Sequence, residues 1–62
     1  MLYRVELTAE TGKQTRIHET GNYYEAIKHC RMAEANPQIA EIVCKIDRRN
    51  GEGMVEVSRY TK

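Results

Sequence analysis

Residues 22–36, NYYEAIKHCRMAEAN, constrain the fold most, because they predict a single helix between two pairs of strand-like runs. Asn22 can accept hydrogen bonds from the amides of the first turn, and Glu25 follows three residues later, as in a capping box. Pro37 cannot continue a helix and disfavours helical geometry at Asn36. The sequence therefore predicts one helix with a defined start and a defined end.

Apolar side chains recur on one face of this helix at steps of about 100° per residue. The predicted buried face consists of Tyr23, Ala26, Ile27, Cys30 and Ala33. A helix of about 14 residues is only marginally stable alone, so we expect it to pack on a sheet. The exposed side carries residue types that are favoured at protein interfaces, namely Tyr24, Lys28, Arg31 and Met32.

Four runs with strand-like alternation flank the helix, at residues 2–9, 13–20, 38–49 and 53–61. The second run contains one strong apolar residue, Ile17, which is typical of an edge strand. The sequence therefore predicts an α+β fold, a single β-β-α-β-β domain over residues 1–62. In it, one helix packs on one face of a four-stranded antiparallel sheet. Strand order 2-1-3-4 is favoured because it centres the most apolar strands, and order 1-2-4-3 stays open.

The first hairpin allows two registers. A two-residue loop would set Val5 opposite His18 and mix the core and solvent faces. A three-residue loop with Gly12 in the left-handed position sets Val5 opposite Ile17, and we favour it.

In the second hairpin, Asn50-Gly51 is typical of a two-residue turn. That turn predicts Cys44 opposite Val57 on the inner face and Lys45 opposite Glu56 on the outer face. The residues expected to face the helix are Tyr3, Val5, Leu7, Ile17, Ile42, Cys44, Ile46, Val55 and Val57.

Length and composition exclude several classes of protein. A chain of 62 residues allows one domain, and 40% hydrophobic with 31% charged residues is ordinary for a globular fold. The net charge of +1 does not point to nucleic acid or to a membrane surface. We find no apolar run long enough to span a bilayer and no signal peptide pattern, so we expect a cytoplasmic protein with reduced cysteines.

The residues with metal-binding or nucleophilic chemistry are His18, His29, Cys30 and Cys44. A zinc site needs three or four converging ligands, and His18 is expected on the solvent face, away from the cysteines. Both cysteines are expected to be buried, without an activating base. We therefore predict no enzyme activity, metal, cofactor or small-molecule substrate. Whether the two cysteines ever form a disulfide stays open.

The uncovered sheet face is the first choice for a partner-binding surface. It is expected to carry a contiguous apolar patch, which monomers rarely expose, made of Leu2, Val43, Met54 and Tyr60. We therefore expect a homodimer or a protein partner there, so that Val43→Lys would weaken assembly without unfolding the monomer. The exposed helix side, Tyr24, Lys28, Arg31 and Met32, is the second choice. The alternative is a weak nucleic-acid binder that uses Arg4, Arg16, Lys28 and Arg31, whose affinity would fall steeply with salt.

One resemblance concerns the helix and the second hairpin. The helix opening Tyr-Tyr-Glu-Ala-Ile, the exit Ala-Asn-Pro and the turn Arg-Asn-Gly resemble those of many tiny proteins of bacteria and their phages. This resemblance implies an accessory role in a phage or mobile element, by binding and modulating a host protein.

Overall fold

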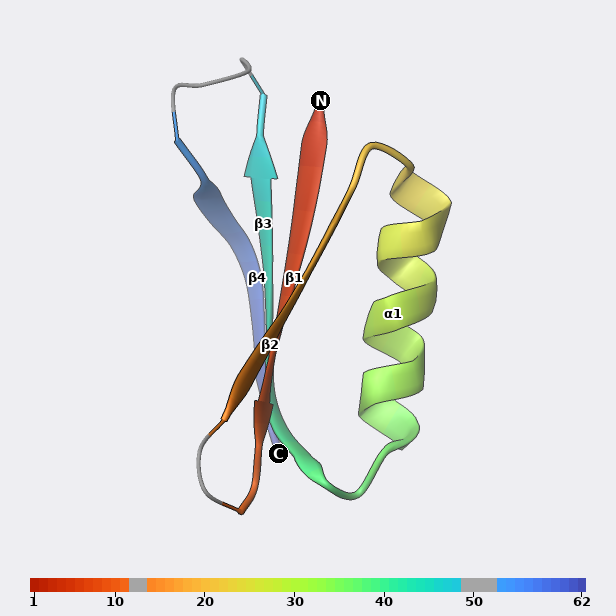
Figure 1. Ribbon diagram of the computed structural model, residues 1–62, viewed down its shortest axis with the longest axis vertical. Helices are drawn as coiled ribbons and strands as arrows, with labels where there is room; N and C mark the ends of the chain where they lie inside the picture. The colour runs from red at the N-terminus through yellow and green to blue at the C-terminus, as the bar shows by residue number, and fades with distance from the viewer. Residues whose placement is uncertain (12–13, 49–52) are drawn as a thin grey trace.

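The computed structural model describes residues 1–11, 14–48 and 53–62. Its elements are β1 (Leu2–Ala9), β2 (Thr15–Thr20), α1 (Tyr23–Ala35), β3 (Ile39–Asp47) and β4 (Val55–Thr61). The strands form one antiparallel sheet in the order β2-β1-β3-β4, and α1 runs along one face of it (Figure 1). The predicted α+β fold and the favoured strand order are confirmed, and the order 1-2-4-3 is wrong.

The start of α1 is capped by two neighbouring polar side chains. Asn22 Oδ1 accepts hydrogen bonds from the amides of Tyr24 at 2.9 Å and Glu25 at 3.3 Å, as predicted. The Glu25 carboxylate accepts from the Thr20 hydroxyl at 2.9 Å, and Thr20 Oγ1 accepts from the Asn22 amide at 3.0 Å. The second half of the capping box therefore runs through Thr20, the last residue of β2, and this links the strand to the helix.

The end of α1 is held by the far end of the chain. Asn36 leaves the helix in an extended conformation, and its side-chain oxygen accepts from the Gln38 amide at 2.9 Å. Lys62 Nζ donates to the carbonyl oxygens of Ala33 at 3.0 Å and Asn36 at 2.5 Å. Its charge therefore lies against the negative end of the helix, where the two carbonyl oxygens also accept the amides of Asn36 and Ile39.

The core lies between α1 and the three strands that it contacts, β1, β2 and β3. Its buried side chains are Val5, Leu7, Ala26, Ala33 and Ile42. Three residues predicted to be inward are instead exposed: Ile17 at 54%, Val55 at 64% and Val57 at 50%. Val55 and Val57 are exposed because they lie on β4, which α1 does not reach.

The buried face of α1 is centred closer to β2 than the helical periodicity of its sequence predicts. Ala26 and Ala33 are buried, whereas Ile27 and Cys30 are half-buried and Tyr23 is 55% exposed. The side of the helix that carries Tyr23 and Ile27 therefore borders the uncovered part of the sheet.

The favoured register of the first hairpin is wrong. Val5 lies opposite His18, and Ile17 lies opposite Glu6 on the outer face. This register places Arg4 opposite Glu19, and the two side chains form an ion pair at 2.9 Å. An edge strand has little apolar area to bury, so the packing of His18 on the helix outweighs the burial of Ile17.

The second hairpin contains a β-bulge that the sequence pattern does not reveal. Lys45 lies opposite Glu56 as predicted, but the register shifts between Cys44 and Lys45. Cys44 therefore lies opposite Ser58 rather than Val57, and the remainder of β4 turns over. The turn predictions for Gly12 and Gly51 lie outside the described residues.

Candidate functional site

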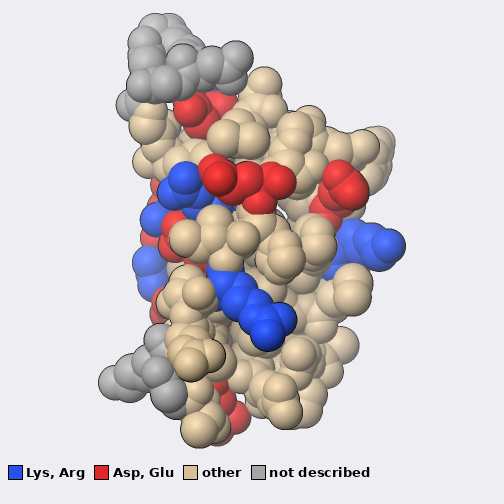
Figure 2. All heavy atoms as spheres, in the orientation of Figure 1, with Lys and Arg blue, Asp and Glu red and all other residues tan. Residues whose placement is uncertain are grey.

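The outer sheet face carries linked ion pairs rather than an apolar patch. Lys45 Nζ lies 2.9 Å from Glu6, and the Arg59 guanidinium lies 2.8 Å from Glu41 and 2.7 Å from Glu56. Basic and acidic side chains alternate along the margin of the sheet away from α1 (Figure 2). The hydrogen bonds from Arg59 hold the pKa of the Glu56 carboxyl below its usual range. This face is therefore polar and internally neutralised.

The four residues of the predicted sheet patch are not brought together as an exposed surface. Leu2 and Met54 are half-buried, and Val43 is 3% exposed. Glu6 and Arg59 lie opposite Val43 on the two neighbouring strands, and their ion pairs with Lys45 and Glu41 close around it. Tyr60 lies opposite Ile42, which places it on the helix side of the sheet. The bulge before Ser58 is the reason that Tyr60 faces the other way.

An exposed apolar surface lies on the helix side of β4, whereas the sequence predicts one on the outer face and places Val55 and Val57 in the core. Val55, Val57 and Tyr60 are 64%, 50% and 48% exposed. Val57 lines a hollow of about 210 Å³ between α1 and the sheet, together with largely apolar side chains that include Ile27, Cys30 and Cys44. We call this surface the β4 trough. Its sheet side comprises the exposed side chains of Val55, Val57 and Tyr60, of which Val57 lines the hollow, and its wall is the flank of α1 at Tyr23 and Ile27.

The predicted helix stripe divides into two parts. Tyr24, Lys28 and Arg31 line a hollow beside Ile27, next to the wall of the β4 trough. Met32 is 60% exposed, as predicted, but it borders a different hollow on the β2 side of the helix. Within the part of the chain that the structure describes, neither Lys28 nor Arg31 makes an ion pair.

Cys30 and Cys44 are free thiols at the base of the β4 trough, with their Sγ atoms 3.0 Å apart. Burial raises the pKa of Cys30 to about 12, and the hydrogen bond with Cys44 adds to this rise. Because the thiolate is the nucleophile, Cys30 is poorly suited to nucleophilic chemistry at neutral pH.

This raised pKa predicts slow alkylation of Cys30. At pH 8, iodoacetamide should modify Cys30 in the folded protein at least about a hundredfold more slowly than in urea, since its thiolate fraction is far smaller than that of a free cysteine. Peptide mass spectrometry after timed quenching gives both rates. Equal alkylation rates in the folded and unfolded protein would show that folding does not raise the pKa of the Cys30 thiol.

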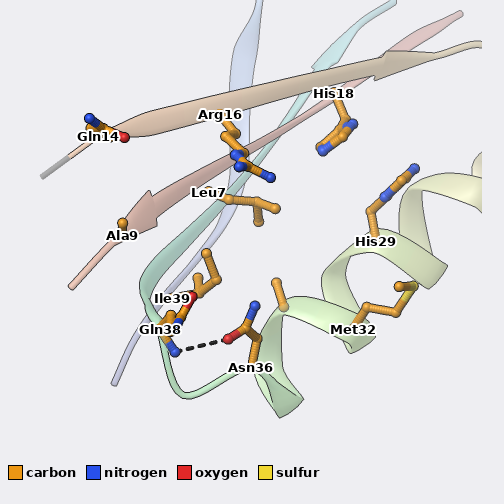
Figure 3. A pocket seen from close by; sticks show the side chains of 11 residues that line it. Leu7, Ala9, Gln14, Arg16, His18, His29, Met32, Asn36, Gln38 and Ile39 are labelled. Carbon is orange, nitrogen blue, oxygen red and sulfur yellow. Dashed lines mark hydrogen bonds between the residues drawn. The ribbon is translucent and has the colours of Figure 1, made fainter. Parts of the chain in front are cut away.

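A second hollow, of about 480 Å³, lies between β2 and the C-terminal half of α1. Arg16 and His18 project from β2 toward the helix, and His29 projects from α1 toward them (Figure 3). The imidazole rings of His18 and His29 stack with centroids 4.4 Å apart and planes 12° apart. We call this the His18–His29 hollow. The prediction that His18 faces solvent away from the helix is wrong, because it rested on the wrong hairpin register.

The sequence contained no signal that could decide the register on which this hollow depends. The rejected register pairs Arg4 with Glu19, a charge-complementary cross-strand pair, whereas the favoured one pairs Glu6 with Arg16. Both registers offer one such pair, so counting charges alone could not separate them.

The four basic residues of the nucleic-acid alternative do not share one surface. Arg4 lies on the outer face and is engaged by Glu19 at 2.9 Å and Glu6 at 3.9 Å. Arg16 lines the His18–His29 hollow, and Lys28 and Arg31 lie beside the β4 trough.

Comparison of the chain with protein-family models, with curated proteins and with solved structures finds no match. Among the described residues, no three histidine, cysteine or acidic side chains converge as metal ligands would. None of the described helical segments has the length and apolarity that a membrane span requires.

Proposed function

We propose that this chain is a protein-interaction module that binds an amphipathic helix of a partner protein in the β4 trough. The observation that carries this proposal is that α1 contacts β1, β2 and β3 but leaves the apolar side chains of β4 exposed. Exposed apolar side chains that adjoin an apolar hollow are typical of sites where another protein docks.

The width of the open strip favours a helix as the occupant. Neighbouring strands lie about 4.8 Å apart, whereas a helix with its side chains is about 10 Å across. One helix therefore covers only part of a four-stranded sheet, and a second helix alongside α1 would complete the layer. Val57 and Tyr60 would contact its apolar face from below and Ile27 from the side, as in other helix-in-groove complexes.

The charges beside the trough favour a partner helix with acidic residues flanking its apolar face. Lys28 and Arg31 border the wall of the trough and have no ion-pair partner among the described residues. By contrast, Arg4, Lys45 and Arg59 on the outer face are all paired. Complementary charge at the rim speeds association and selects between partners.

This proposal places the protein in the cytoplasm and assigns it no catalysis. The accessory role that the resemblance to small bacterial and phage proteins implies stays a prediction. Nucleic-acid binding has less support, because Arg4 is neutralised and Arg16 lies on the opposite flank of α1 from Lys28.

The test is selection from a displayed library of helical peptides with an apolar stripe and randomised flanking charges. Selected peptides should carry acidic residues beside the stripe, and they should shift the amide NMR signals of β4 and of α1 near Ile27. Val57→Lys should weaken binding at least about tenfold, because it places a charge on the apolar sheet side of the trough.

Ile17→Lys is the matched control, since Ile17 is 54% exposed and lies on the outer face. It should leave peptide binding unchanged. Equal loss in both variants, or signal shifts confined to the outer face, would overturn the proposal. Concentration-dependent shifts of the β4 signals without peptide would instead assign the trough to a second copy of this chain.

A further inference from the structure

The His18–His29 hollow lies on the opposite flank of α1 from the β4 trough and has a different chemistry. Its floor is apolar, formed by Leu7, Ala33 and Ile39, and its rim is polar. The polar part of the rim consists of Gln14, Arg16, His18, His29, Asn36 and Gln38, and Ala9 and Met32 also border the hollow. Its volume of about 480 Å³ lies within the range of small-molecule sites.

The lining contains Arg16 but no acidic residue. In the described part of the chain, no carboxylate lies within ion-pair distance of Arg16, whereas Arg4, Lys45 and Arg59 all have acidic partners. The negative end of α1 borders the hollow, but Lys62 binds its carbonyl oxygens. A cationic group in a concave site without acids attracts anions.

The histidine stack argues against a single metal ion held by both rings. Because the ring planes are only 12° apart, the nitrogen lone pairs of His18 and His29 run side by side and do not converge on one point. Both imidazoles line the same hollow as Arg16, and each ring can donate an N–H to a bound group.

We propose that the His18–His29 hollow binds a small organic oxyanion, either a phosphate monoester or a carboxylate. The anionic group is held by Arg16 together with the imidazoles, through charge-assisted hydrogen bonds. The organic part rests on Leu7, Ala33 and Ile39. This assigns a small-molecule site where the sequence predicted none.

The test is an NMR titration at constant ionic strength with four probes: butyl phosphate, butyrate, inorganic phosphate and butanol. Saturable shifts should be confined to the amides of residues 14–18 and 29–36. The organic anions should bind more tightly than inorganic phosphate because of the apolar floor, and butanol should not bind. The relative affinities of butyl phosphate and butyrate identify the anion class.

Arg16→Gln should weaken binding about tenfold or more, since it removes the charged donor. Arg31→Gln removes an equally unpaired charge outside the hollow and should leave binding unchanged. His29→Gln should also weaken binding, because it removes one of the two imidazoles that line the hollow beside Arg16. Arg16 is exposed, so its variant should remain folded, which the amide spectrum checks.

Three outcomes would overturn the proposal: no saturable shift with either organic anion, equal affinity in the Arg16→Gln protein, or equal weakening by Arg31→Gln. Zinc titration provides a further check. Tight zinc binding that shifts both histidines, without any response to the anions, would reassign the hollow to a metal.

Discussion

Ile42→Ala should lower the free energy of unfolding by about 2–5 kcal/mol. Ile42 is 2% exposed at the centre of the sheet, and it packs with Val5, Leu7, Ala26 and Ala33. A domain of this length has a total stability of roughly 3–9 kcal/mol, so the change should leave the protein partly or wholly unfolded near body temperature. Urea denaturation followed by circular dichroism measures the loss.

Ile17→Ala is the matched control, because it removes the same atoms from a residue that is 54% exposed on the outer face. It should change the free energy of unfolding by less than about 0.5 kcal/mol. The hairpin register predicted from the sequence would instead make Ile17 a core residue. A loss for Ile17→Ala comparable to that for Ile42→Ala would therefore contradict the observed register.

The features that could be predicted from the sequence are those with local physical signals. Asn22 and Pro37 mark the helix ends through capping and the missing proline donor, and the alternating runs mark the strands. The weakly apolar run around Ile17 correctly indicated an edge strand, and this decided the strand order. The outward pairing of Lys45 with Glu56 also followed from the charges.

The features that could not be predicted depend on the relation between elements. The bulge in β4 changes the face of Tyr60, and no residue type near Ser58 requires it. A one-residue change of register in β2 brings His18 to the helix and moves Ile17 away, and both registers offer a charge pair. The candidate surfaces in the structure differ from the predicted ones for this reason. Alternation identifies the two faces of a strand, but the register decides which face is inward.

The position of α1 across the sheet could not be predicted from the residue pattern either. The helix wheel identifies an apolar face, but the side chains do not specify which three of four strands that face covers. Because α1 lies over β1, β2 and β3, Val55 and Val57 became surface residues, although their residue type suggested the core.

Val43→Lys should lower the free energy of unfolding by at least about 2 kcal/mol, because a lysine there replaces a buried apolar side chain. Val43 lies on the outer face, yet it is only 3% exposed. The new ammonium group would also lie among the cationic ends of Lys45 and Arg59, which close around this position. The earlier expectation, a folded monomer with weakened assembly, rested on an exposed Val43 and is replaced by this one.

Val57→Lys makes the same substitution on the neighbouring strand at a residue that is 50% exposed, and it should cost little stability. Comparison of the two variants by thermal and urea denaturation therefore separates burial from residue type. If Val43→Lys were as stable as Val57→Lys, the ion pairs would not shield Val43 in solution. The outer face would then be open as the sequence pattern suggested, and Leu2, Val43 and Met54 would form the candidate partner surface.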